Sequence, residues 1–97
     1  MNIDHVIESA CDVAGCSVDE YNRRTKKRKP SLAREFVCGY LHANGHSNDY
    51  IASVIGRDKS LVSHNLLRFH LDMKKDTFNF MYHLFVERLE LRTKKKR

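Results

Sequence analysis

The sequence predicts a small all-α protein: a compact bundle of five to six helices that contains a helix-turn-helix, followed by an added C-terminal helix. The 97 residues include one proline and four glycines, so few turns are available. Apolar residues recur at helical spacing along most of the chain. Hydrophobic residues make up 41% and charged residues 31%, a balance typical of a folded domain rather than a disordered chain.

The first two helices are expected over residues 2–14 and 18–22. Gly15 ends the first helix, and Ser17 with Glu20 forms the S-x-x-E pattern of a capping box that begins the second. The apolar positions of the first helix are Ile3, Val6, Ile7, Ala10 and Val13.

The basic segment 23–29 follows and is expected to be a loop, because it has no apolar periodicity. Pro30 is expected at the first position of the third helix, where its missing N–H costs nothing. Asn44 and Gly45 end that helix. Its inner face is expected to carry Ala33, Phe36, Val37, Tyr40 and Leu41.

The middle of the chain predicts the helix-turn-helix. Ser47 is placed to cap a helix over residues 48–55, which Gly56 ends. Asp58 is placed to cap the next helix, whose buried stripe is Val62, Leu66 and Phe69. The two helices and the three-residue turn between them form the motif.

The last helix is expected from about residue 77 to residue 92, with Asp76 as its cap. Its main apolar stripe is expected to cover the core of the preceding domain. The alternative is that a second apolar face forms a homodimer or partner surface. We divide the chain into residues 1–75, the domain that contains the helix-turn-helix, and 76–97, the C-terminal helix and basic tail. The main stripe is Phe78, Met81, Tyr82, Phe85 and Leu89, and the second face is Phe80, Leu84 and Leu91.

Charge is unevenly distributed along the chain, which carries a formal net charge of +6. Residues 1–22 contain acids and no Lys or Arg, whereas residues 23–34 contain Lys and Arg and no acid. This segregation produces a local positive field, which indicates a polyanionic partner. Segment 23–29 is expected to follow a phosphate backbone or enter a minor groove. The alternative is an ordinary solvated run of charges.

The second helix of a helix-turn-helix lies in the major groove, and its N-terminal residues meet base edges. Here those residues are Asp58, Lys59, Ser60 and Leu61, which offer respectively an acceptor for cytosine, a donor for guanine, a hydroxyl and a contact for a thymine methyl. His64 and Arg68 lie one and two turns further on, where they would meet phosphates. The alternative is that residues 58–61 are only an exposed helix start.

Residues 55–64, with the core Arg57-Asp58-x-Ser60-x-Val62-x-His64, resemble the signature of the C-terminal DNA-binding domain of the bacterial replication initiator DnaA. Ala33-Arg34 resembles an Ala-Arg pair in a helix of that family, and segment 23–29 falls where the family has a basic loop. The opening residues 13–20 also resemble the family's entry sequence. The resemblance covers roughly residues 3–71.

The resemblance implies the compact helical fold of the Trp repressor group and a role for each matched position. Arg57 to Leu61 would take the major-groove positions, and Arg34 would contact phosphate. Lys26, Lys27, Arg28 and Lys29 would lie at the minor groove or backbone. Lys59 and Leu61 depart from the family's His and Thr, which implies an altered sequence preference.

Other classes of function find little support in the sequence. There is no phosphate-binding G-x-x-x-x-G-K-[ST] loop, and no hydrolase motif accompanies the six histidines. The spacing of the three cysteines matches no zinc site, so no metal and no cofactor is expected. No aromatic platform accompanies the basic segment, which argues against RNA binding. With no apolar run long enough for a membrane span, we expect a cytoplasmic protein.

The sequence therefore predicts a non-enzymatic module that binds double-stranded DNA, with a role in replication or transcription regulation. The alternative is a protein-interaction module that binds a replication or transcription partner, or a second copy of itself, through residues 76–92.

Overall fold

The structure, a computed structural model, describes residues 2–23 and 27–94, and these ranges contain no strand. The helices of the described part are α1 (Ile3–Ala14), α2 (Val18–Asn22), α3 (Arg28–Ala43), α4 (Asn48–Ile55), α5 (Lys59–Asp72) and α6 (Asp76–Lys94). The expected all-α class is confirmed.

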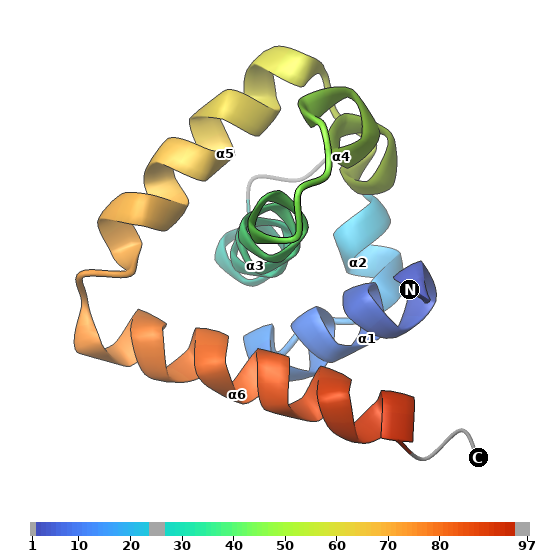
Figure 1. Cartoon of the computed structure of the whole chain (residues 1–97), viewed down its shortest axis with the longest axis vertical. Coiled ribbons are helices and arrows are strands. Elements are labelled where there is room, and N and C mark those ends of the chain that lie inside the picture. The colour runs from blue at the N-terminus through green and yellow to red at the C-terminus, as the bar shows by residue number, and fades with distance from the viewer. Residues whose placement is uncertain (1, 24–26, 95–97) are drawn as a thin grey trace.

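Helix α3 is the centre of the fold. It contacts each of the five other helices, and in Figure 1 it is seen nearly end-on with the others arranged around it. The sequence predicted one apolar face for this helix, but every residue from 33 to 39 is buried. A helix enclosed on all sides buries its whole circumference, and this is why two charged residues, Arg34 and Glu35, lie inside.

The expected caps explain where most helices begin and end. Ser17 and Glu20 make both hydrogen bonds of the capping box at the start of α2. The Ser47 side chain accepts a hydrogen bond from the Tyr50 N–H at the start of α4. Gly15 and Gly56 end α1 and α4 with positive φ angles of 86° and 65°, a conformation that costs glycine little.

Two expected helix starts and one expected capping hydrogen bond differ from the structure. Helix α3 begins at Arg28, which puts Pro30 at its third position rather than its first. The first backbone N–H groups of a helix have no partner inside the helix, so proline is tolerated there as well. Asp58 stands at the N-cap of α5, but its side chain makes no capping hydrogen bond. Asp76 is the first residue of α6 rather than its cap.

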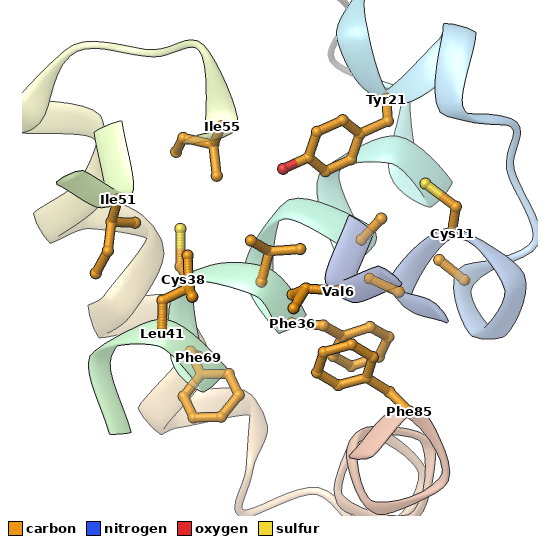
Figure 2. Close-up of a cluster of buried hydrophobic side chains, with 14 of the residues drawn as sticks. Val6, Cys11, Tyr21, Phe36, Cys38, Leu41, Ile51, Ile55, Phe69 and Phe85 are labelled. Carbon is orange, nitrogen blue, oxygen red and sulfur yellow. The ribbon is translucent and has the colours of Figure 1, made fainter. Parts of the chain in front are cut away.

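Helix α6 belongs to the core, as its main stripe predicted. Phe36 of α3 stacks on Phe85 of α6 with ring centroids 5.8 Å apart, and Figure 2 shows the two rings side by side. Phe36 also contacts Phe78 at 5.1 Å. Phe78, Phe85 and Leu89 are at most 7% exposed. Burial of one such side chain contributes roughly 1.5–3 kcal/mol, so the fold depends on α6.

The acidic face of α1 is matched by one cation from α6. The Arg92 guanidinium donates to Glu8 Oε1 at 3.0 Å and also pairs with Asp12. These contacts join residues 80 and 84 positions apart. They explain part of the charge segregation, because some of the N-terminal acids serve the packing of α6 on α1.

Candidate nucleic-acid interface

The N-terminal turn of α5 faces outward, as the sequence predicted. Asp58, Lys59 and Ser60 are exposed, and Leu61 is 43% exposed although it is a large apolar residue. The opposite side of the same helix carries Val62, Leu66 and Phe69, all of which are buried. We call residues 58–61 the exposed turn.

Helix α4 packs against α5 and also contacts α3. Lys59 Nζ lies 3.4 Å from Asp49 Oδ1 of α4, and both side chains are more than 60% exposed. An ion pair in such a position contributes about 0–1 kcal/mol. Lys59 can therefore exchange this partner for an acceptor on a ligand at little cost.

The turn between α4 and α5 is joined to the start of the basic segment. Arg57 donates from Nη2 to the carbonyl oxygen of Arg23 at 2.9 Å and from Nη1 to the Gly56 carbonyl, also at 2.9 Å. Arg57 is therefore a connecting residue in this structure: it holds the helix-turn-helix beside the point where α2 ends.

Arg34 does not present its charge to solvent. It is 4% exposed, and its Nη2 donates to the carbonyl oxygens of Tyr21 at 2.9 Å and Arg23 at 2.7 Å. Burial, and next the charge of Arg57, lower its pKa. The phosphate contact that the family resemblance implied is not accessible to an enclosed guanidinium. Arg34 instead fastens the end of α2 to α3, and we leave it out of the interface.

Residues 27–29 of the basic segment lie at the start of α3. Lys27 occupies the N-cap position, Arg28 and Lys29 the first turn, and all three are exposed. That turn contains no acidic residue and has no side-chain cap. The positive end of the helix dipole therefore adds to three cationic side chains. Lys26, also expected in the interface, lies outside the described residues.

The two expected phosphate contacts on α5 are both at the surface. His64 is exposed, and the Arg68 side chain is 55% exposed. Arg68 also has a neighbour that sequence reasoning did not anticipate: its Nε lies 3.7 Å from Oε1 of the buried Glu35. Arg68 is thus placed between the surface and a group inside the protein.

Helix α5 runs between the two described ends of the basic segment. Arg23 meets the start of α5 through Arg57, while Arg28 lines the same pocket as Arg68 and Asp72 near the end of that helix. The structure therefore places Arg23 and Arg28 near opposite ends of α5. It does not place Lys27, Arg28 or Lys29 in contact with the exposed turn.

The sequence did not predict the role of the Arg23 carbonyl, because every residue has a backbone carbonyl and the residue type does not show which one accepts a hydrogen bond. A signal for the burial of Arg34 did exist. It lies four residues after Pro30 and four before Cys38, on a mostly apolar helical face.

Comparison with models of known protein families, with curated proteins and with solved structures found no match. Within residues 2–23 and 27–94, no helix is long and apolar enough to cross a membrane. The same residues contain no group of three or more His, Cys, Asp or Glu side chains placed to hold a metal ion.

Proposed function

We propose that this protein binds double-stranded DNA, with the exposed turn of α5 against base edges in the major groove. The observation that carries the proposal is the position of that turn: four solvent-facing residues at the start of a helix whose other side is firmly packed. Lys59 would donate to guanine and Leu61 would contact a thymine methyl. Arg57 would hold the turn in place through the Arg23 carbonyl.

The spacing of the cations along α5 supports this orientation. Lys59 and Arg68 are nine residues apart on α5, which at 1.5 Å per residue is about 14 Å along the helix. The major groove of B-DNA is about 12 Å wide, so groups near Arg68 would reach the phosphates that border it. Arg28 and Arg68 line one pocket and would provide these backbone contacts together.

Salt dependence of duplex binding tests the proposal. Fluorescence anisotropy of a labelled duplex should show a log affinity that falls linearly with log salt, with a slope of about −0.9 per neutralised phosphate. Lys29→Ala should make that slope shallower by about one and weaken all sequences alike. Arg88→Ala, an exposed cation on α6, is the matched control. Absence of binding at low salt would remove the proposal.

The biological role we propose is in replication or transcription regulation. It rests on the resemblance of residues 55–64 to the initiator signature, together with the position of the exposed turn. A module of this kind would occupy sites in competition with an initiator or regulator. Comparing the DNA sites that this protein selects with the sequence bound by the initiator would test this role. Selected sites unrelated to that sequence would favour a role in transcription regulation.

A second candidate function rests on the second face of α6. Phe80 is 69% and Leu91 52% exposed, and Leu84 between them is partly buried. A protein partner or a second copy would cover these residues. Truncation of α6 is unsuitable as a test, because Phe78, Phe85 and Leu89 are in the core. Sedimentation of Phe80→Ser against the parent chain is suitable: an unchanged mass and unchanged partner capture would argue against this function.

A further inference from the structure

A pocket of about 500 Å³ opens where α5 turns into α6, beside the start of α3. This volume lies within the range of roughly 300–1,000 Å³ found for small-molecule sites. Its walls combine ionic groups with an apolar surface. The lining residues are Arg28, Ser31, Leu32 and Glu35 of α3, Arg68 and Asp72 of α5, Lys75, and Asp76, Thr77, Phe78 and Met81 of α6.

Glu35 is the unusual group in this pocket. Its side chain is only 4% exposed, and its Oε2 atom is buried with no hydrogen-bond partner. Its other oxygen is 3.7 Å from Arg68 Nε, beyond the usual 2.7–2.9 Å of a charge-assisted hydrogen bond. A buried carboxylate normally requires close donors on both oxygens, because burying an unpaired charge is costly. When Glu35 is ionised, the pocket lining therefore contains an acceptor for which the protein supplies no donor.

The other ionic groups facing the pocket largely offset one another. Lys75 Nζ lies 3.2 Å from Asp72 Oδ1, and Arg68 is directed to Glu35. Arg28 and Asp76 complete the set, one of each sign. An anion entering the pocket would meet Arg68 and Lys75, which already have carboxylate neighbours. It would also leave Glu35 Oε2 without a donor.

We propose that this pocket binds a small protonated alkyl amine, whose ammonium group donates to Glu35 and Asp72. The alkyl part would lie on Leu32, Phe78 and Met81, which form the apolar side of the pocket. An ammonium group has three donors and no acceptor, so it suits a site where carboxylate oxygens lack donors. This site is separate from the exposed turn, although it shares Arg28 and Arg68 with the proposed backbone contacts, and amine binding can be measured in the absence of DNA.

A proton occupies the place of the amine when the pocket holds no ligand. Burial raises the pKa of Glu35 to about 8, and its hydrogen bond to Asp72 and the charge of Asp72 add to that effect. The same hydrogen bond is the main cause that lowers the pKa of Asp72. An arriving ammonium group would displace the shared proton into solvent. Amine binding should therefore tighten with rising pH, by up to about tenfold per pH unit below the pKa of Glu35.

Calorimetric titration of the full chain with 1-butylamine and 1,4-diaminobutane tests the proposal. We expect binding at about pH 8.5, weaker binding at about pH 6.5, and proton release measured from the dependence of the heat on the buffer. Butyrate and 1-butanol carry the same alkyl chain without the ammonium group and should not bind. Butyrate binding in preference to the amine would overturn the proposal.

Glu35→Gln is the central variant and should bind the amine at least about tenfold more weakly, because it loses the charged acceptor. Glu87→Gln, an exposed acid on α6, is the matched control and should bind like the parent chain. Equal binding by both variants, or no binding by the parent chain at high pH, would overturn the proposal. If Glu35→Gln does not fold, amine binding by Asp72→Asn and the pH dependence of amine binding by the parent chain test the proposal instead.

Discussion

Arg57 Nη2 lies 2.9 Å from the carbonyl oxygen of Arg23, thirty-four residues earlier in the chain. The same carbonyl accepts a hydrogen bond from Arg34 Nη2 at 2.7 Å. One backbone oxygen thus joins three parts of the fold: the end of α2, the central helix and the turn of the helix-turn-helix. The position of the exposed turn relative to the basic segment depends on this junction.

Arg57→Ala should lower the free energy of unfolding by about 1 kcal/mol, since a hydrogen bond from a charged donor is lost at a half-exposed site. Arg57→Lys keeps the charge but not the two-pronged geometry, so it should lose a similar amount. Urea denaturation measures both. Full stability in Arg57→Lys would show that charge alone, rather than the contact with Arg23, matters here.

Gly39→Ala should destabilise the protein by about 1–3 kcal/mol, despite the better helix propensity of alanine. A Cβ atom at Gly39 would lie 2.4 Å from the Phe69 ring, well inside van der Waals contact. That ring cannot easily move, because it packs edge-on against Phe78 and Tyr82. The midpoint of thermal unfolding measures the effect.

A double-mutant cycle separates this close approach from a general effect of the substitution. In a Phe69→Leu background the ring is absent, so the added methyl group of Gly39→Ala should cost much less. An equal cost in both backgrounds would contradict the packing of α3 on α5 described above.

Arg92→Ala should destabilise the packing of α6 on α1 by about 0.5–1 kcal/mol, because Arg92 pairs with both Glu8 and Asp12 at a partly exposed position. The difference from the parent chain should shrink in about 1 M salt, where exposed charges are screened. Denaturation at low and high salt measures this. A loss unaffected by salt would indicate that the aliphatic stem, not the charge, stabilises the contact.

Stability should fall as pH rises from about 5 to 8, because burial raises the pKa of Glu35 to about 8. The folded state holds the Glu35 proton more tightly than the unfolded chain does. This proton stabilises the fold fully at a pH below the pKa of Glu35 in the unfolded chain. The stabilisation is lost as pH rises through the pKa of Glu35 in the folded protein. Glu35→Gln has no such proton, so its unfolding free energy should vary less over this range. Parallel pH profiles for the two proteins would contradict the burial of an ionisable Glu35.

Local signals predicted most of the fold. The Ser17–Glu20 box, the Ser47 cap and the glycines at 15 and 56 are short-range features, and each stands where the sequence indicated. The centrality of α3 was not predicted, since it follows from how the other helices pack around it. For that reason the burial of Arg34 and Glu35 was unexpected.

The candidate site was predictable in part. The outward position of residues 58–61 follows from the buried stripe on the other side of α5, which is visible in the sequence as Val62, Leu66 and Phe69. The junction at the Arg23 carbonyl and the pocket around Glu35 depend on tertiary contacts between residues far apart in the chain. Periodicity and residue type carry no information about such contacts.

The central claim is that the exposed turn of α5 binds base edges, and selection of bound sequences from a random duplex library tests it most directly. The parent protein should enrich a defined motif, and Lys59→Ala should shift the preference at one position, by about 1–3 kcal/mol for a lost base contact. Lys29→Ala should retain the parent motif at lower affinity. No enriched motif, or an identical motif with Lys59→Ala, would contradict the claim.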